Sequence, residues 1–110
     1  DEMGIASRRA DGSLRPFITI WFVRGGDGLY VRSAYGPMNG WFRRALASGH
    51  GRVRVGNWEH DVAFKVPDAA VTDDELHRAF HTKYDHYGPR FVDPVVSDVA
   101  ADCTLRLVPR

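Results

Sequence analysis

The segment from Arg15 to Arg24, RPFITIWFVR, is apolar at most positions and rich in β-branched and aromatic residues. This composition favours a β-strand, and successive side chains of a strand point to opposite faces of its sheet. One face carries Ile18, Ile20 and Phe22, and the other carries Phe17, Thr19, Trp21 and Val23. Because both faces are apolar, we expect a central strand with the domain core on one side. A helix, a partner subunit or a flat ligand would cover the other side.

Turn residues separate this strand from its neighbours. Asp11-Gly12-Ser13 follows an extended run over residues 4–9, which predicts a first strand there. The run Gly25-Gly26-Asp27-Gly28 predicts a tight hairpin. A third strand is expected over residues 29–35, and it should end at Gly36-Pro37 because proline cannot donate to the ladder.

The middle of the chain predicts a helix and a second hairpin. The helix should run from about Gly40 to Ser48, with Asn39 as its N-cap and glycines at its end. Residues 52–55 and 58–66 then alternate between polar and apolar positions around a glycine turn, which is typical of a hairpin.

The last third begins with the capping-box sequence Thr72-Asp73-Asp74-Glu75, which predicts a helix to about His86. Residues 88–101 show no regular pattern, and residues 103–108 predict a final strand. The expected order is β-β-β-α-β-β-α-β in one domain, residues 1–110. This order favours a mainly β fold, a small antiparallel barrel or curled sheet with flanking helices.

Composition limits both the expected cellular compartment and the class of partner. Cys103 is the single cysteine, so no internal disulfide can form and we expect a reducing, cytoplasmic environment. No apolar run approaches the roughly 20 residues that cross a bilayer, so no membrane partner is expected. The sequence pI of about 8.2 and the lack of a recognised nucleic-acid motif argue against nucleic acid.

Charge is distributed unevenly along the chain. Residues 1–54 carry nine arginines and four acidic residues, whereas residues 55–110 carry six basic and ten acidic residues. A basic half suggests an anionic partner. Ordinary solvation of a surface rich in arginine is an equally good explanation.

The passage from the third strand to the first helix concentrates groups that bind anions. A phosphate or carboxylate needs arginine forks, a hydroxyl and backbone N–H groups near a helix start. Arg32, Ser33, the loop at Gly36, the helix start near Gly40, Arg43 and Arg44 could supply these groups. Tyr35 and Trp41 add flat surfaces for an aromatic ring. The alternative is a crossover in which Trp41 and Phe42 are core residues and the arginines are solvated.

No set of side chains is arranged for catalysis by itself. His77 and His81 are spaced to share a metal, but no third ligand completes the set, so a solvated or partly buried pair is the preferred interpretation. Cys103 is expected in the core. Tyr84 and Tyr87 are expected to pack, with a proton donor over a pocket as the alternative. An enzyme of this kind would need a cofactor for its reactivity.

The run from Ser7 to Gly56 resembles the split β-barrel flavin and deazaflavin proteins, above all the small deazaflavin-dependent nitroreductases. That family has a basic loop ending in glycine, an Arg/Pro-led strand with an aromatic pair, a Gly-Asp step, a Ser/Gly loop, and a tryptophan before a short helix and a Val-x-Val strand. The matching residues are Arg8, Arg9, Gly12, Arg15, Pro16, Trp21, Gly26, Asp27, Ser33, Gly36, Trp41 and Val53-Arg54-Val55. Within that superfamily the chain is most similar to short bacterial proteins known only as a domain of unknown function.

The resemblance implies a split barrel of the FMN-binding or pyridoxamine-phosphate-oxidase-like type. It also implies a homodimer with FMN or a deazaflavin in a groove near the subunit interface. The tail phosphate would meet a basic loop that carries Arg8, Arg9 and Arg15, and the ring would lie near Thr19 and Trp21. Further residues implied along the phosphate or ribityl chain are Ser33, Ala34, Tyr35 and Gly36, with Trp41 and Arg44 beside it.

The sequence therefore predicts a cofactor-dependent oxidoreductase, similar to nitroreductases or quinone reductases, that passes a hydride to a small substrate. A non-catalytic protein that holds a small ligand on the same barrel is the first alternative. A dimeric structural domain is the second.

Overall fold

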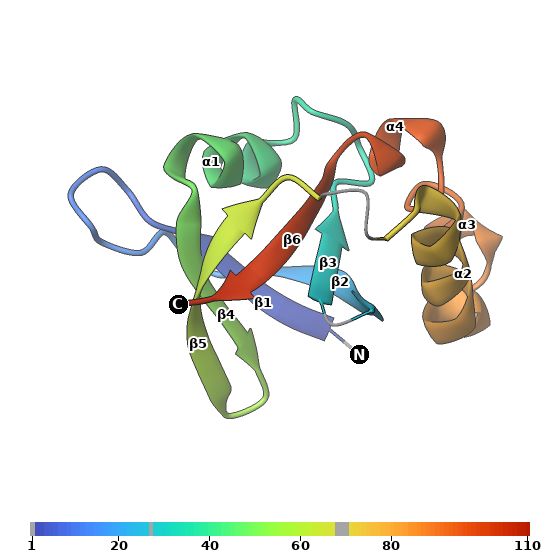
Figure 1. The fold of residues 1–110 in the computed structure, drawn as a ribbon, viewed down its shortest axis with the longest axis horizontal. Helices are drawn as coiled ribbons and strands as arrows, with labels where there is room; N and C mark the ends of the chain where they lie inside the picture. Colours follow the sequence, from blue (N-terminus) through green and yellow to red (C-terminus); the bar gives the residue numbers. More distant parts are fainter. Residues whose placement is uncertain (1, 27, 68–70) are drawn as a thin grey trace.

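The computed structural model describes residues 2–26, 28–67 and 71–110. In these ranges the elements follow the predicted order (Figure 1). The strands are β1 (Glu2–Ser7), β2 (Ile18–Gly25), β3 (Gly28–Arg32), β4 (His50–Val55), β5 (Trp58–Lys65) and β6 (Thr104–Pro109). The helices are α1 (Gly40–Ser48), α2 (Asp73–Tyr84), the 3₁₀ turn η1 (Asp85–Tyr87), α3 (Pro89–Val92) and α4 (Asp98–Ala101).

The six strands form a closed antiparallel barrel in the order β1-β2-β3-β6-β5-β4, which confirms the predicted fold class. Neighbouring strands pair by hairpins where the sequence predicts them, and β6 closes the barrel between β3 and β5. Asp27, in the predicted β2–β3 turn, lies outside the described residues.

Several boundaries differ from the prediction: β1 ends at Ser7 and not Arg9, β2 begins at Ile18 and not Arg15, and β4 begins at His50 and not Arg52. Three further differences have local reasons. β3 ends at Arg32, before residue 35, because Ser33 starts a turn in which its hydroxyl donates to the Gly36 carbonyl at 2.7 Å. α2 ends at Tyr84 and continues as η1. The region 88–101, predicted to be irregular, contains α3 and α4, each with a start signal: a proline at the beginning of α3 and a Ser97 cap on α4.

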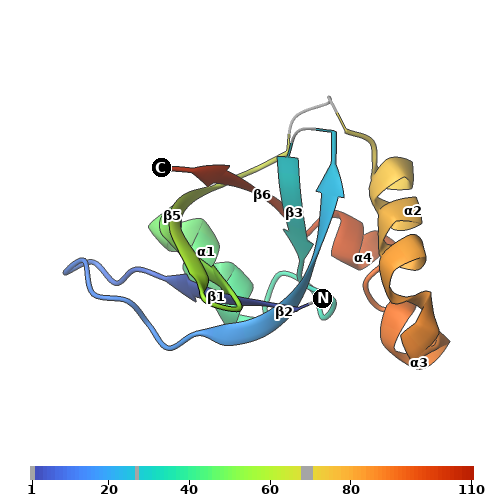
Figure 2. The ribbon, with the colours of Figure 1, turned by 90° about the horizontal axis from the view of Figure 1, so that it is seen from below.

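Two apolar clusters stabilise the fold. The first fills the barrel and includes Val31 and Leu105, and α1 packs Phe42 and Ala45 against it across one end of the barrel (Figure 2). The second lies between the outer face of β2 and the helices α2 and α3. A helix is therefore the cover on the second face of β2, but only over Trp21 and Val23, because Thr19 is exposed.

Within the closed barrel, the first half of β2 separates from β3. Ile18–Trp21 pairs with β1, whereas pairing with β3 begins only at Phe22 and continues to Gly25. Among the described residues, no strand pairs with the other edge of Ile18–Trp21. The chain after Arg32 turns away from β2 toward α1. This separation of β2 from β3 creates the candidate site.

Candidate functional site

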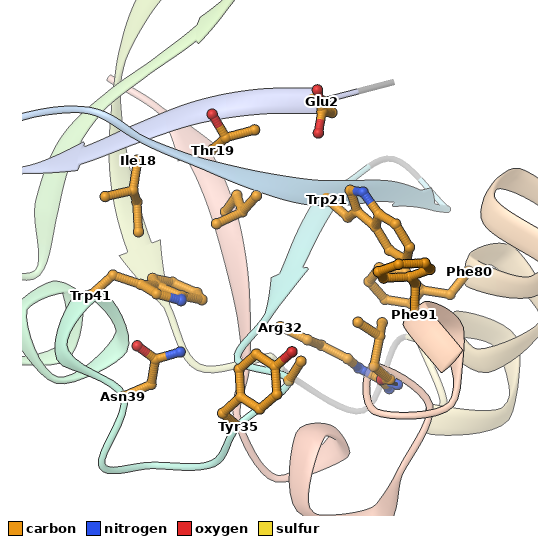
Figure 3. Close-up of a pocket in the computed structure, with 13 residues that line it drawn as sticks. Glu2, Ile18, Thr19, Trp21, Arg32, Tyr35, Asn39, Trp41, Phe80 and Phe91 are labelled. Atoms are coloured by element: carbon orange, nitrogen blue, oxygen red, sulfur yellow. Dashed lines mark hydrogen bonds between the residues drawn. The ribbon is translucent and has the colours of Figure 1, made fainter. Parts of the chain in front are cut away.

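A groove of ≈ 320 Å³ lies where β2 and β3 separate (Figure 3). Ile18 and Ile20 of β2 form one wall, and Tyr35 lies across from them in the loop that follows β3. Trp41 closes one end, and Trp21, Phe80 and Phe91 lie at the other. Aromatic side chains thus surround an opening whose size is in the lower part of the range of small-molecule sites, about 300–1,000 Å³.

A ring stack and two hydrogen bonds hold the Trp21 end of the groove. The indole of Trp21 stacks on the ring of Tyr84, with centroids 4.1 Å apart and planes 4° from parallel. The Tyr84 hydroxyl accepts from the Phe22 N–H and donates to the Phe22 carbonyl, both at 3.0 Å. Burial raises the pKa of this hydroxyl to about 12. Tyr84 is therefore a packing residue, as predicted, and its hydroxyl is committed to the backbone.

Arg32 is a buried cation in the groove wall, only 5% exposed. Its guanidinium donates to Thr104 Oγ1 at 2.9 Å and to the Val95 carbonyl at 3.2 Å. Nη2 makes no hydrogen bond to any described residue and lies 3.5 Å from the Asp73 carboxylate, which is largely exposed. Burial lowers the pKa of Arg32. Its charge is thus only weakly compensated, and it joins β3 to β6, to α2 and to the segment after α3.

His77 completes this arrangement from α2. Arg32 Nη1 lies 2.8 Å from His77 Nδ1. Because arginine can only donate, Nδ1 must accept, so His77 is neutral with its proton on Nε2. Burial, followed by the charge of Arg32, lowers the pKa of His77.

A second, basic hollow of ≈ 350 Å³ lies beside the groove. Arg8, Arg9, Arg15 and Arg44 line it. A hollow of only ≈ 10 Å³ lies between the two, and it shares Ile18 and Trp41 with the groove and Arg15 and Arg44 with the basic hollow. An aromatic site and a cationic site are thus neighbours, and Trp41 lies at the end of the groove nearest to the basic hollow.

The four arginines differ in how they are held. Arg8 donates to the Gly12 carbonyl at 2.8 Å and pairs with Asp61 at 3.1 Å, and Arg9 donates to the Leu14 carbonyl at 3.0 Å. These bonds hold the β1–β2 loop. The guanidinium groups of Arg15 and Arg44 bond to none of the residues that the structure describes. They are therefore the cations available to an anion.

Asp11 belongs to the same loop as Arg8 and Arg9. Its carboxylate accepts from the backbone N–H and the hydroxyl of Ser13, at 2.9 and 2.7 Å. Asp11 is absent from the lining of the basic hollow. The Asp11 carboxylate therefore bonds within its own loop and would not repel an anion bound in the basic hollow.

A family profile for an uncharacterized protein conserved in bacteria, DUF2255, matches residues 1–107. The chain belongs to this family. Membership confirms the expected relationship to a bacterial family of unknown function, and the likeness to deazaflavin nitroreductases stays a prediction. No curated protein matches the chain.

The DUF2255 chain is similar in fold to the crystal structure of HutZ, the heme storage protein from Vibrio cholerae. The TM-score is 0.63, over 99% of this chain and 81% of that chain, at 11% sequence identity. At this identity the likeness supports the split-barrel type of fold and nothing finer.

The residues predicted for cofactor binding fall into three groups in this DUF2255 protein. The groove is lined by Thr19, Trp21, Ala34, Tyr35 and Trp41. The basic hollow is lined by Arg8, Arg9, Arg15 and Arg44. Ser33 and Gly36 line neither: Ser33 is fully buried and bonds to Gly36, so these two residues shape the turn that positions Tyr35.

Several groove residues were not predicted. Phe80, Phe91 and Val95 reach the groove because α2 and α3 pack on the outside of β2, which no local pattern reveals. Asn39 lines the groove, although its position predicts only a helix cap. Arg32, predicted from the sequence to be among the groups that could bind an anion, does line the groove.

The metal and nucleophile hypotheses find no structural basis. Within the described ranges, no group of three or more His, Cys, Asp or Glu side chains could hold a metal. His77 is bonded to Arg32, and His81 is bonded to Asp85 at 2.7 Å. Cys103 is buried as predicted, and burial raises the pKa of its thiol. No helix in the described part of the chain has the length and apolarity to cross a bilayer.

Proposed function

We propose that this protein binds a flavin-type cofactor, FMN or a deazaflavin, with its ring in the groove and its phosphate at the basic hollow. The observation that carries the proposal is the proximity of the two sites: the small hollow between them is lined by Trp41 from the aromatic groove and by Arg15 and Arg44 from the basic hollow. A ligand with a planar ring and an anionic tail matches this arrangement.

The groove fits the ring by its chemistry. Its aromatic and aliphatic lining removes a planar ring from water, and aromatic side chains favour offset-stacked or edge-on contacts with such a ring. Glu2 also lines the groove. The buried guanidinium of Arg32 lies in the same wall, with its Nη2 3.5 Å from the largely exposed Asp73 carboxylate. It favours a ring system that carries carbonyl oxygens or takes up negative charge on reduction.

The basic hollow fits the tail by its charge. Arg15 and Arg44 can each offer a guanidinium fork to a phosphate, and such bonds are shorter and stronger than neutral ones. The residues that line this hollow within the described chain include no acid. Arg8 and Arg9 add long-range attraction while they hold the loop.

The bound cofactor would supply hydride transfer to a small oxidised substrate such as a nitroaromatic compound or a quinone. The chain would supply binding and orientation. Trp21 is fixed by Tyr84, so it would limit the tilt of the ring at one end. The hydroxyls of Tyr35 and Thr19 bond to no residue that the structure describes and remain available to ligand or substrate.

A second subunit would cover the open side of the groove, as the resemblance implies. Apolar side chains are exposed around it: Tyr35 is 81% exposed, Met38 73% and Phe91 55%. Large exposed apolar groups gathered at one site indicate a binding surface. This homodimer remains a proposal.

Haem is the second planar ligand to consider, because HutZ is a heme storage protein. Haem iron in proteins is held by His, Cys, Met or Tyr. Among the described residues that line the groove, none is His, Cys or Met, and the one tyrosine, Tyr35, is 81% exposed, so it is not held toward a haem iron. The groove chemistry therefore favours a flavin over haem.

The direct test is a titration of the purified protein with FMN, an oxidised deazaflavin and haemin. We expect FMN or the deazaflavin to lose fluorescence on binding with a dissociation constant well below millimolar, and haemin to show no Soret shift typical of axial ligation. If both FMN and the deazaflavin stay unbound at millimolar concentration, the proposed function is wrong. Oxidation of the reduced bound cofactor by a small quinone then tests the oxidoreductase activity separately.

A further inference from the structure

Asn39 occupies the N-cap position of α1 but does not cap the helix. Its backbone is extended, with φ −61° and ψ 129°, and its carbonyl accepts from the Arg43 N–H at 3.1 Å. Its side chain makes no capping hydrogen bond. An N-cap asparagine normally accepts from a backbone N–H two or three residues on, so the usual reason for asparagine at this position is missing.

The free carboxamide of Asn39 points into the groove beside the indole of Trp41 (Figure 3). No residue that the structure describes forms a hydrogen bond with it. Asn39 is partly buried, and the wall opposite it is apolar because Ile18 lies there. The carboxamide is thus left without a partner among the described residues at the groove, where a ligand group could bond to it.

The chemistry of the carboxamide defines the group that it can recognise. It presents one acceptor oxygen beside an NH₂ donor in a single plane. The complementary partner is an adjacent N–H and C=O, as found in a lactam or an imide. Asparagine recognises the edges of nucleobases by the same bidentate arrangement.

We propose that Asn39 recognises the imide edge of the heterocycle in the groove and so selects flavins and deazaflavins over planar rings that lack this edge. The inference rests on the proposed function and makes it more specific. The imide end of the ring would lie at Trp41, the end of the groove nearest to Arg15 and Arg44. A porphyrin has no such edge.

The test uses two ligands without a phosphate tail, lumiflavin and 3-methyllumiflavin, in which a methyl group replaces the imide proton. We expect the wild-type protein to bind lumiflavin about 5-fold to 150-fold more tightly than the methylated compound, the usual range for one bidentate pair. Asn39→Ala should lower the affinity for lumiflavin to that for 3-methyllumiflavin, and leave the latter nearly unchanged.

Two controls separate recognition from folding. Asn39→Ser supplies a good N-cap residue without the amide, and it should lose the discrimination as completely as Asn39→Ala. The thermal unfolding midpoint of Asn39→Ala should remain at the wild-type value, because no capping bond is lost. If Asn39→Ser restored lumiflavin affinity, or if the midpoint fell with the affinity, Asn39 would be a structural residue and the inference would be overturned.

The outcomes also separate this inference from the proposed function. If lumiflavin and FMN both fail to bind, both proposals are wrong. If lumiflavin binds but the affinity ratio is the same in Asn39→Ala and wild type, the proposed function stands and this inference alone is overturned.

Discussion

Arg32 and His77 form a partly buried hydrogen bond of 2.8 Å between β3 and α2, in which the histidine is the acceptor. The bond joins the barrel to the helix that supplies one end of the groove. It requires neutral His77, since a protonated imidazole has no acceptor and would face a guanidinium. Because Arg32 lines the groove, protonation of His77 would break this bond and disturb the groove wall.

The first prediction is a loss of stability as pH falls. The folded pKa of His77 lies below its value in the unfolded chain, through burial and Arg32, although Asp73, Asp74 and Asp98 raise it in part. The unfolded state therefore binds more protons below about pH 6.5. The contribution of neutral His77 to the free energy of unfolding is complete above that pH and decreases as the pH falls toward the folded pKa of His77.

His77→Asn tests this prediction because an asparagine oxygen can replace Nδ1 as an acceptor but cannot titrate. Urea unfolding measured between about pH 7 and pH 5 should show a smaller decrease in the free energy of unfolding for the variant than for wild type. His81→Asn is the control, because His81 lies exposed on the same helix and pairs with Asp85. An equal decrease in wild type and His77→Asn would contradict the assignment.

The second prediction concerns Arg32 itself. Arg32→Met removes bonds to Thr104, His77 and Val95, of which those to Thr104 and Val95 are buried and the one to His77 is partly buried. We expect a loss of roughly 2–4 kcal/mol in the free energy of unfolding, the scale for several buried polar groups left without partners. Arg32→Lys should recover only part of it, because an ammonium cannot reproduce the fork.

Urea unfolding of both Arg32 variants measures this loss. Arg24→Met is the matched control, because Arg24 is an exposed arginine on the neighbouring strand β2. A Met variant as stable as wild type would show that the buried network contributes nothing to stability.

The third prediction separates Tyr84 from catalysis. Tyr84→Phe removes the hydroxyl that bonds both backbone groups of Phe22, while Lys83 Nζ still donates to the Phe22 carbonyl at 2.8 Å. We expect a loss of about 1–2 kcal/mol in stability and little change in cofactor affinity, since the ring stack remains. If Tyr84→Phe kept wild-type stability but abolished turnover by the bound cofactor, the hydroxyl would be a proton donor instead.

The fourth prediction concerns the phosphate tail. Arg15→Ala combined with Arg44→Ala should weaken FMN binding about tenfold or more, equivalent to about 1.4 kcal/mol, and should reduce its salt dependence. Lumiflavin, which lacks the tail, should bind the double variant as it binds wild type. Arg43→Ala is the control, because Arg43 is exposed on α1 and does not line the basic hollow. Equal weakening of FMN and lumiflavin would place the tail elsewhere.

The sequence predicts the hairpins and the barrel well because their signals are local. Alternating side chains and turn glycines act over a few residues, as in β4 and β5. The groove depends on contacts between distant residues. Arg32 bonds to groups 45 to 72 positions away, and Phe91 reaches the site only because α3 follows α2 along β2.

Two site predictions depended on local patterns that the fold uses differently. Arg8 and Arg9 form the expected basic loop, but their guanidinium groups hold that loop together. Ser33 follows a strand, as a phosphate-binding residue would, yet its hydroxyl closes a turn. Conversely, Asn39 has the pattern of a helix cap, and only the coordinates show that its side chain is free of the helix.

The three tryptophans of the chain allow the most direct test of the central claim, that a planar anionic ligand binds between Trp21 and Trp41. Trp58 is the internal control, because it lies half-exposed in the β4–β5 hairpin and stacks on His60, away from the groove. Indole N–H resonances in a ¹H–¹⁵N spectrum would be followed during titration with FMN. The account predicts saturable shifts of the Trp21 and Trp41 signals with the Trp58 signal unchanged. Shifts of Trp58 alone, or of none of the three, would contradict it.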